Sequence, residues 1–475
     1  MTGRMRRHAS YRDVLKSAPI AFYMPSHAID AVAEKVSKKI TPTKSEADSE
    51  KAFAAGVSAA LSKNLPKQCR MCFVGSAARD TGLRGDNDID LFVSFPRSFS
   101  KEEIVAKTFK ATRRALKAKW EKHYAEHPYL QAQHGAFRVE VIPCFETSPH
   151  EELKSAVDRS PLHMDYLQKR LTETQRRDVR VLKQFLKNAG LYGAELRVQG
   201  FSGLVCEYLV LNYRSFRNLV EAAAQWIPPV VVDMEGYYAE RRHPFAEPLV
   251  VIDAIDKNRN AAAVVSETNL CKFIALCRAF RSKPSVSFFF GKRRKHSASE
   301  ISRALRSRGT AIVILKIAAP KLVEDILYPQ LHKTERALSR HLALQDFRML
   351  GTASFMAEDG AFFVVECESA ERPRLKRVQG PPVSAAKAVA DFVRAHKAAH
   401  RGPYIEGGRV FAERLRAVTF LETEIGALLR SPESWGAASH FVKPLKKAKF
   451  APPLSLKAEA MQGLAAYLFR RESWW

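Results

Sequence analysis

The sequence contains no long hydrophobic run. No segment approaches the ~20 consecutive apolar residues that cross a bilayer, and the most apolar segment, residues 311–319, is interrupted by Lys316. The basic N-terminal residues 1–14 also lack the apolar stretch of a secretory signal. These absences predict a cytoplasmic protein with no membrane partner.

Cysteine is also scarce. The 475 residues include seven cysteines, an odd number scattered along the chain. This distribution argues against a disulfide framework and for a reducing compartment. Cys69 and Cys72 form a C-x-x-C pair with no second pair or histidine near it. Because a structural zinc needs four ligands, we expect these two thiols to pack in a core.

Positive charge, in contrast, is abundant. Lys and Arg outnumber Asp and Glu by 77 to 50, which gives a net charge of +27. Hydrophobic residues still make up 46% of the chain, a content typical of packed globular domains and not of disordered chains. A large basic excess on a folded protein favours a polyanionic partner such as a nucleic acid.

The length and the order of periodic segments predict an α+β protein of several domains. We place a small palm of mixed strands and helices at residues 1–160, a helical middle domain at 161–284, and a ferredoxin-like α+β body with a tail at 285–475. The strands expected in the palm are 69–74, 88–95 and 136–144. We expect two helices before them, one at 30–39 and one that begins at a capping box of Thr43 and Glu46. A long basic helix is expected at 101–124.

The elements expected further along support the same division. The middle domain has predicted helices at 172–189, 203–226 and 268–281. In the body we expect strands at 285–290 and 311–317, a hairpin of 352–356 with 361–366, and helices at 297–306, 321–345 and 384–399.

The strand at residues 88–95 carries the first chemical signal. Residues i and i+2 of a strand project from the same face, so Asp88 and Asp90 present two adjacent carboxylates while Ile89 and Leu91 face the core. Two like charges this close repel unless a cation lies between them. Mg²⁺ suits such a pair because it takes oxygen ligands and bridges carboxylates to substrate phosphates.

The turn that precedes this strand carries the second signal. Gly75 and Ser76 follow one strand and begin a predicted helical turn. A glycine there allows backbone N–H groups to approach a triphosphate, and a helix N-terminus adds positive potential. Ser76 can donate its hydroxyl to a phosphate, and Arg79 can donate a planar pair of N–H groups. A Gly-Ser turn twelve residues before a D-x-D strand is a fairly specific pattern.

The combination resembles the polymerase β-like nucleotidyltransferase superfamily, and the string GSAARDTGLRGDNDIDLFVSFP is similar to the archaeal-type (class I) CCA-adding enzymes. The resemblance extends over roughly residues 75–331. It includes the segments YAEHPY, VEVIPC, KSAVDRSPLH, LKQFLKNAGLYGAE, GFSGLVCE, DAIDKNRNAAA and LYPQL.

The resemblance implies three catalytic carboxylates. Asp88 and Asp90 match the first two metal ligands of the family, and Glu140 falls at the third, which ligates the metal that activates the attacking 3′-hydroxyl. The family usually has Asp at this third position. Glu140 is one methylene longer, so either the backbone shifts to accommodate it or the site is slower.

The same resemblance implies the nucleotide contacts. The residues that match the family's contacts to the incoming nucleotide are Ser76, Arg79, His163, Lys183 and Tyr192. Glu126, His127 and Arg259 correspond to a region near the base, where cytosine and adenine are distinguished from guanine and uracil.

The reaction implied is template-independent addition of CCA to the 3′ end of tRNA. Two Mg²⁺ ions would assist in-line attack of the RNA hydroxyl on the α-phosphate of CTP or ATP, with release of pyrophosphate. The tRNA acceptor stem would be held by shape through basic side chains. Candidate surfaces are residues 292–295, 303–308 and 443–449, the last with His440 and Phe441. A homodimer is one oligomeric state that the sequence leaves open.

Two alternatives remain at this point. A poly(A) polymerase or oligoadenylate-synthetase-like enzyme would share the metal site and differ in its choice of RNA and base. A catalytically decayed RNA-binding protein would keep the fold without the chemistry; the presence of Ser76, Arg79, Asp88 and Asp90 argues against it, and only the unusual Glu140 favours it.

Overall fold

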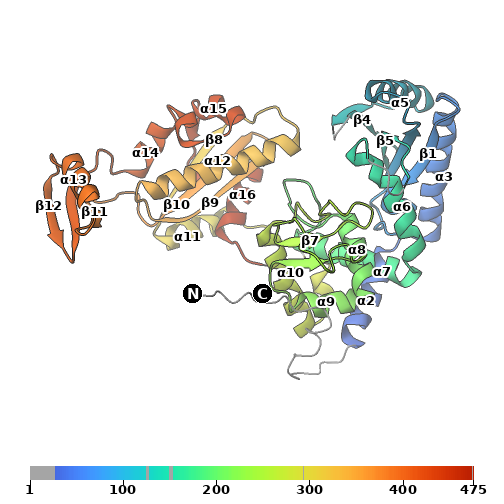
Figure 1. Cartoon of the computed structure of the whole chain (residues 1–475), viewed down its shortest axis with the longest axis horizontal. Coiled ribbons are helices and arrows are strands. Elements are labelled where there is room, and N and C mark those ends of the chain that lie inside the picture. The colour runs from blue at the N-terminus through green and yellow to red at the C-terminus, as the bar shows by residue number, and fades with distance from the viewer. Residues whose placement is uncertain (1–26, 125–127, 149–152, 292–293, 473) are drawn as a thin grey trace. The chain divides into compact units, whose positions relative to one another are not determined.

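The computed structural model describes residues 27–124, 128–148, 153–291, 294–472 and 474–475 (Figure 1). The described residues form two compact units, one within 27–291 with 474–475, and the other within 294–472. We call these the catalytic unit and the body unit. In the described ranges, no helix is both long and apolar enough to cross a membrane.

A five-stranded mixed sheet forms the palm of the catalytic unit. Its order is β1-β2-β5-β4-β3, and only the β2–β5 pair is parallel. The elements of the palm are α3 (Lys44–Ser62), β1 (Arg70–Val74), α4 (Gly75–Ala78), β2 (Asp88–Phe95), α5 (Lys101–Ala115), β3 (Glu121–Tyr124), β4 (Pro128–His134), β5 (Phe137–Phe145), η1 (Ala156–Asp158) and α6 (Arg159–Arg170).

The period-2 pattern of the central strands separates the two faces of this sheet. Ile89, Leu91 and Val93 of β2 and Val139 of β5 are fully buried in one core with residues of α3 and α5. The alternate positions of β2 and β5 therefore face the other way. Both helices begin with a capping box, at Thr43 and Ser100 respectively, which satisfies free N–H groups of the first turn.

Helices surround the second core of the catalytic unit. Fully buried aromatic side chains such as Phe185, Phe273 and Phe280 fill this core, and the N-terminal helix α2 packs on α7 within it. The elements are α2 (His27–Ile40), α7 (Glu173–Ala189), α8 (Gly203–Tyr213), α9 (Phe216–Ala223), the parallel strands β6 (Val230–Val232) and β7 (Leu249–Val251), α10 (Glu267–Ser282) and η2 (Val286–Phe288).

The body unit is built on a four-stranded antiparallel sheet in the order β14-β8-β10-β9. Helices α12 and α15 cover one face of this sheet. Along the chain the elements run β8-α12-β9-β10-α15-β14, so the sheet has its first to fourth strands in the spatial order 4-1-3-2. This is the arrangement of a ferredoxin-like layer, as predicted. Helices α11 and α16 cover the opposite face. The elements are α11 (Ala298–Arg308), β8 (Ala311–Ile317), α12 (Glu324–Leu344), β9 (Met349–Ala357), β10 (Gly360–Cys367), α14 (Leu421–Leu428), η3 (Pro432–Trp435), α15 (Ser439–Leu445), β14 (Lys449–Phe450), η4 (Pro453–Ser455) and α16 (Ala458–Leu468).

A small subdomain interrupts this layer between β10 and α14. It consists of the sheet β11-β13-β12, with β11 (Leu375–Pro382), β12 (Arg401–Glu406) and β13 (Arg409–Leu415), and of α13 (Ala386–Ala395) packed on β11. Of this subdomain, the sequence predicted only the helix, at 384–399.

Several predicted elements are corrected by the structure. The helix expected at 101–124 ends at Ala115, and β3 and β4 follow it. The helix expected at 203–226 is two helices, because Arg214 has a φ of 73° and Ser215 caps α9. The strand expected at 285–290 is the 3₁₀ turn η2. The carbonyls of Phe288 and Phe289 accept hydrogen bonds from the side chains of Asn188 and Gln184 of α7, respectively.

All seven cysteines are free thiols. Cys69 packs against the core under α3 and α5, whereas Cys72 packs with Val74 and Phe92 in a small cluster on the other face of the palm. The two thiols of the C-x-x-C pair therefore belong to different hydrophobic clusters, as expected for core residues and not for a zinc site.

Candidate active site

Strand register brings two carboxylates of the palm directly side by side. Asp90 of β2 is the partner of Glu140 in the parallel β2–β5 pairing, and Asp88 lies two residues away on the same face of β2. Val74, the last residue of β1, is the partner of Asp90 on the other side. Asp88, Asp90 and Glu140 therefore share one face of the sheet, next to the turn that starts at Gly75.

These carboxyl groups are strained electrostatically. Burial, then the neighbouring Glu140 and Asp88, raises the pKa of Asp90 to about 7. Burial is also the main cause of the raised pKa of Asp88 and of Glu140. Charged forms are disfavoured where carboxylates are desolvated beside one another. A bound cation would relieve both effects.

Asp88 and Glu140 each contact a neighbouring polar side chain. The Arg138 guanidinium lies 3.0 Å from the Asp88 carboxylate, and the Gln131 amide donates to Glu140 over 3.0 Å. In the part of the chain that the structure describes, no three acidic, histidine or cysteine side chains are arranged to hold a metal ion as they stand. The oxygen-only donor set and its repulsion fit a hard divalent cation. Asp88 and Glu140 would have to turn from their present partners to bind it.

The glycine of the Gly-Ser turn has a steric role. Gly75 has a φ of 81°, and a Cβ built on it would lie 2.0 Å from Oδ2 of Asp90. Only a glycine allows the turn to pass this close to the carboxylate. The following helix, α4, is a single turn, and Ser76 accepts hydrogen bonds on its carbonyl from the N–H groups of Thr81 and Gly82.

Arg79 and Lys183 meet in a buried polar cluster beneath this turn. Arg79 Nε donates to Glu207 Oε1 over 3.0 Å, and Thr81 Oγ1 donates to the same oxygen over 2.5 Å. Lys183 Nζ donates to the Thr81 carbonyl over 2.9 Å. Burial lowers the pKa of Lys183, although Glu207 opposes this effect. The structure thus places both predicted triphosphate contacts at the junction of the palm with α7 and α8.

Helix α7 also binds the rest of this loop by charge. Arg176 lies 3.5 Å from the Asp80 carboxylate, and Lys187 lies 2.8 Å from Asp86. With Lys183 between them, these residues form a basic stripe on one face of the helix. The stripe faces residues 80–86, which lead from the Gly-Ser turn to the carboxylates.

Tyr192 lies close to Lys183. A Cβ built on Gly203 would be 3.4 Å from the Tyr192 hydroxyl and 3.6 Å from Lys183 Nζ. Both polar groups therefore lie against Gly203. Tyr192 packs against the helical core, and burial raises the pKa of its hydroxyl far above the ordinary value. It is neutral at any physiological pH.

His163 belongs to a second buried cluster, centred on Asp253. His163 Nε2 lies 2.9 Å from Asp253 Oδ1, Tyr208 donates to the same oxygen over 3.0 Å, and Arg259 Nη1 donates to Oδ2 over 2.6 Å. Burial opposes ionisation of Asp253, but the hydrogen bonds and charges of His163 and Arg259 outweigh it and lower its pKa. Glu126 and His127 lie outside the described residues.

Sequence reasoning missed the two carboxylates at the centres of these clusters. Glu207 and Asp253 are both fully buried. The available signal was a single acidic residue within an apolar segment: GLVCEYLVL around Glu207 and LVVIDAI around Asp253. Such residues are rarely buried unless they are paired.

Three family models match the chain over separate ranges. They are "Nucleotidyltransferase domain" at residues 56–163, "tRNA nucleotidyltransferase, second domain" at 177–290, and "CCA-adding enzyme, C-terminal domain" at 308–440. The CCA-adding enzyme of Haloarcula marismortui is 37% identical over 414 residues, which cover 83% of this chain and 88% of that protein. The chain belongs to the CCA-adding enzymes.

Other CCA-adding enzymes show similar sequence identity. That of Halobacterium salinarum is 38% identical over 417 residues, or 84% of this chain and 89% of that protein. That of Archaeoglobus fulgidus is 37% identical over 348 residues, or 73% and 78%. The chain is accordingly a nucleotidyltransferase, with a mixed-sheet catalytic domain, a helical middle region and a C-terminal α+β body. The nucleotidyltransferase fold generally works with a divalent metal.

The first prediction concerns Gly75. In this CCA-adding enzyme, Gly75→Ala should lower nucleotide incorporation by about 100-fold or more, because a methyl group would displace the Asp90 carboxylate. Gly85→Ala is the matched control, since Gly85 has a φ of 85° and nothing lies within 4 Å of its added Cβ. It should incur the same backbone strain and keep most of the activity. Equal losses in both variants would refute the steric role.

The second prediction concerns the pH dependence of stability without metal. Because the pKa of Asp90 is raised in the folded protein to about 7, the folded state holds this proton more tightly than the unfolded state. Below about pH 4 Asp90 is protonated in both states and does not change the free energy of unfolding. As the pH rises to about 7, Asp90 lowers the free energy of unfolding by an increasing amount.

The comparison of wild type with Asp90→Asn in a chelating buffer isolates this effect. The variant should be more stable at pH 7.5 by roughly 1–4 kcal/mol, since one pKa unit corresponds to about 1.4 kcal/mol, and the difference should shrink toward pH 4.5. Thermal unfolding at several pH values measures it. A difference that does not change with pH would contradict the assignment.

Proposed function

We propose that this enzyme adds CCA to the 3′ end of tRNA without a template, using CTP and ATP and releasing pyrophosphate. One observation carries the proposal: the sheet face with Asp90 opposite Glu140 and Asp88 beside them, next to a glycine turn, in a chain that resembles CCA-adding enzymes over most of its length. The family resemblance favours tRNA over the substrates of the sister polymerases.

In this proposal the catalytic carboxylates are Asp88, Asp90 and Glu140, and Mg²⁺ is the cation they would bind. Such an ion lowers the pKa of an attacking hydroxyl and neutralises charge on the leaving phosphates. The chain's own contribution is to hold three oxygens on one rigid sheet face and to keep basic groups on the opposite side of the turn. Ser76 and Arg79 would contact the triphosphate, and His163, Lys183 and Tyr192 would hold the incoming nucleotide.

The geometry of Glu140 accommodates its extra methylene without a change of register. Glu140 is in step with Asp90 through the full β2–β5 pairing, with no irregularity along the two strands. Its longer side chain reaches Gln131 on β4, which lies across from it in the next strand pair. We therefore expect the third ligand to bind from a longer side chain on an undistorted backbone.

The third prediction tests the function and the carboxylates together. The purified chain with Mg²⁺ should add two CMP residues and one AMP to a tRNA that lacks its 3′ CCA, and then stop. Asp88→Ala and Asp90→Ala should keep less than a few per cent of the activity, because charge neutralisation by metal ions supplies several kcal/mol of the rate. Glu140→Gln should be nearly inactive, while Glu140→Asp should keep its activity.

The products also separate the alternatives. A long run of AMP would indicate a poly(A) polymerase. No incorporation by wild type would indicate a decayed enzyme. A Glu140→Gln variant with the wild-type rate would place the third carboxylate elsewhere.

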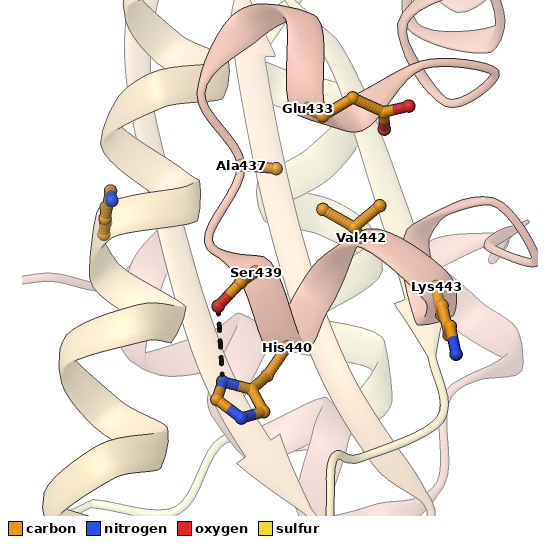
Figure 2. Close-up of a pocket in the computed structure, with 7 residues that line it drawn as sticks. Glu433, Ala437, Ser439, His440, Val442 and Lys443 are labelled. Carbon is orange, nitrogen blue, oxygen red and sulfur yellow. Dashed lines mark hydrogen bonds between the residues drawn. The ribbon is translucent and has the colours of Figure 1, made fainter.

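The tRNA is proposed to bind the body unit through basic side chains. A pocket of about 720 Å³ lies between α12 and α15 and is lined by Lys333, His440, Lys443 and Glu433, among others. Figure 2 shows Ser439, His440 and Lys443 on α15, with Glu433 on η3 above them. Lys333 and Lys443 are the two lysines of this lining, and phosphate oxygens are natural ligands for them.

Contacts within the protein bear on two of the three basic segments, since residues 292 and 293 of the third lie outside the described residues. Phe441, which was predicted to accompany the last segment at the surface, is fully buried in the core. Arg308 forms two hydrogen bonds with the buried Glu366 and so serves the fold. Lys446 is paired with Glu433 at 3.0 Å. Lys443, Lys447 and Lys449 are exposed and are the better candidates for phosphate contacts.

The fourth prediction concerns these lysines. The triple change Lys443→Gln, Lys447→Gln and Lys449→Gln should weaken tRNA binding and flatten the plot of log affinity against log salt by up to about three units, close to one for each lost contact. The control is an equal loss of charge at the exposed Lys35, Lys63 and Lys67 of the catalytic unit. An unchanged slope in the first variant would exclude this surface.

A further inference from the structure

Glu207 is a buried acid that the reaction as described does not use. It lies on α8 with a fully buried side chain, among residues of the helical core. Its Oε1 accepts both the Arg79 and the Thr81 hydrogen bonds, whereas Oε2 is buried and has no hydrogen-bond partner among the described residues. A half-satisfied buried carboxylate is costly and calls for a functional reason.

The charges around Glu207 do not balance. Arg79 and Lys183 bring two positive charges to one negative charge, and the Arg79 side chain is only 11% exposed. These two cations are strong enough to keep the pKa of Glu207 below its ordinary value, although burial raises it. Arg79 keeps 11% of its side chain exposed beside the Gly-Ser turn, so its guanidinium can meet an anion there while Glu207 holds it from below.

The bonding pattern also fixes how Arg79 is presented. Glu207 binds the guanidinium through Nε, which leaves the two Nη groups at the far end of the planar fork. A bidentate grip on a phosphate uses these distal N–H groups. Thr81 extends the restraint to Lys183, because its hydroxyl binds Glu207 while its carbonyl accepts from Lys183.

We propose that Glu207 is a positioning residue for the incoming triphosphate: it orients Arg79 directly and Lys183 through Thr81. The inference rests on the proposed function for the identity of the ligand, a nucleoside triphosphate. In this proposal a residue of α8 controls how tightly the palm binds that ligand, although the sequence predicted no ligand contact on this helix. Glu207 itself touches no substrate.

The test measures CTP affinity directly, without catalysis, by calorimetry on the full chain. Glu207→Gln keeps the shape and removes the charge, and it should raise the Kd for CTP by about tenfold, the usual effect of losing a hydrogen bond to a charged group. Glu207→Asp should recover part of the loss. Thr81→Val, which removes one donor and no charge, should have a smaller effect.

A double-mutant cycle distinguishes positioning from mere support of the fold. An Arg79→Ala background leaves only the route through Thr81 to Lys183, so Glu207→Gln should then change the Kd by no more than Thr81→Val does in the wild-type chain. Equal tenfold effects in both backgrounds, or an unchanged Kd for Glu207→Gln, would overturn the proposal. The matched control is Glu366→Gln, because Glu366 is equally buried and bonded to an arginine in the body unit. It should lower stability and leave CTP affinity unchanged.

Failure of the proposed function would be separately visible. A wild-type chain that binds CTP but incorporates no nucleotide would refute CCA addition, and the cycle would still test Glu207. A chain that incorporates nucleotides normally with Glu207→Gln, at unchanged KM, would refute only the positioning role.

Discussion

The buried contact of Glu207 with Arg79 and Thr81 is the constraint on which the catalytic unit depends. It joins a loop of the palm to a helix more than a hundred residues away in sequence. Besides this contact, the segment from Gly75 to Asp88 is fixed by the buried hydrogen bond of Lys183 to the Thr81 carbonyl and by Leu83 in the helical core. Surface ion pairs such as Lys187–Asp86 are worth little in water. The ends of this segment are the two parts of the site, so its position sets their separation.

The loop also separates two opposite electrostatic environments. On the sheet side, carboxylates crowd together until the pKa of Asp90 reaches about 7. On the helix side, Arg79, Lys183 and the basic stripe of α7 outnumber the acids they contact. A ligand that carries both a metal ion and a polyphosphate is complementary to both at once. Neither environment alone would distinguish a nucleotide from a simple ion.

Local patterns predicted the elements whose causes are local. The alternation of DIDLFVSF gave the limits of β2 correctly, and Thr43 and Glu46 marked the start of α3 through their capping box. The strand expected at 285–290 is wrong: Ser285 caps a 3₁₀ turn there, and the carbonyls of Phe288 and Phe289 accept hydrogen bonds from side chains 100 and 105 residues away in the sequence. The burial of Lys183 could not be foreseen either, since its partner Thr81 lies 102 residues away in the sequence. Whether these residues perform the roles assigned to them stays a prediction.

The interrupted ferredoxin-like layer has a consequence for how the protein is made. A ribosome releases β8, α12, β9 and β10 first, then the whole β11–β13 subdomain, and only afterwards the edge strand β14 and the covering helix α16. Until then one edge of β8 has no neighbour, and the face that α11 and α16 cover together has only α11, which is a state open to pairing with other chains. Lys449 of β14 is the partner of Lys316 of β8, so each of the two strands at this edge of the sheet carries a lysine. Such charges discourage a foreign strand from pairing with β8 in place of β14.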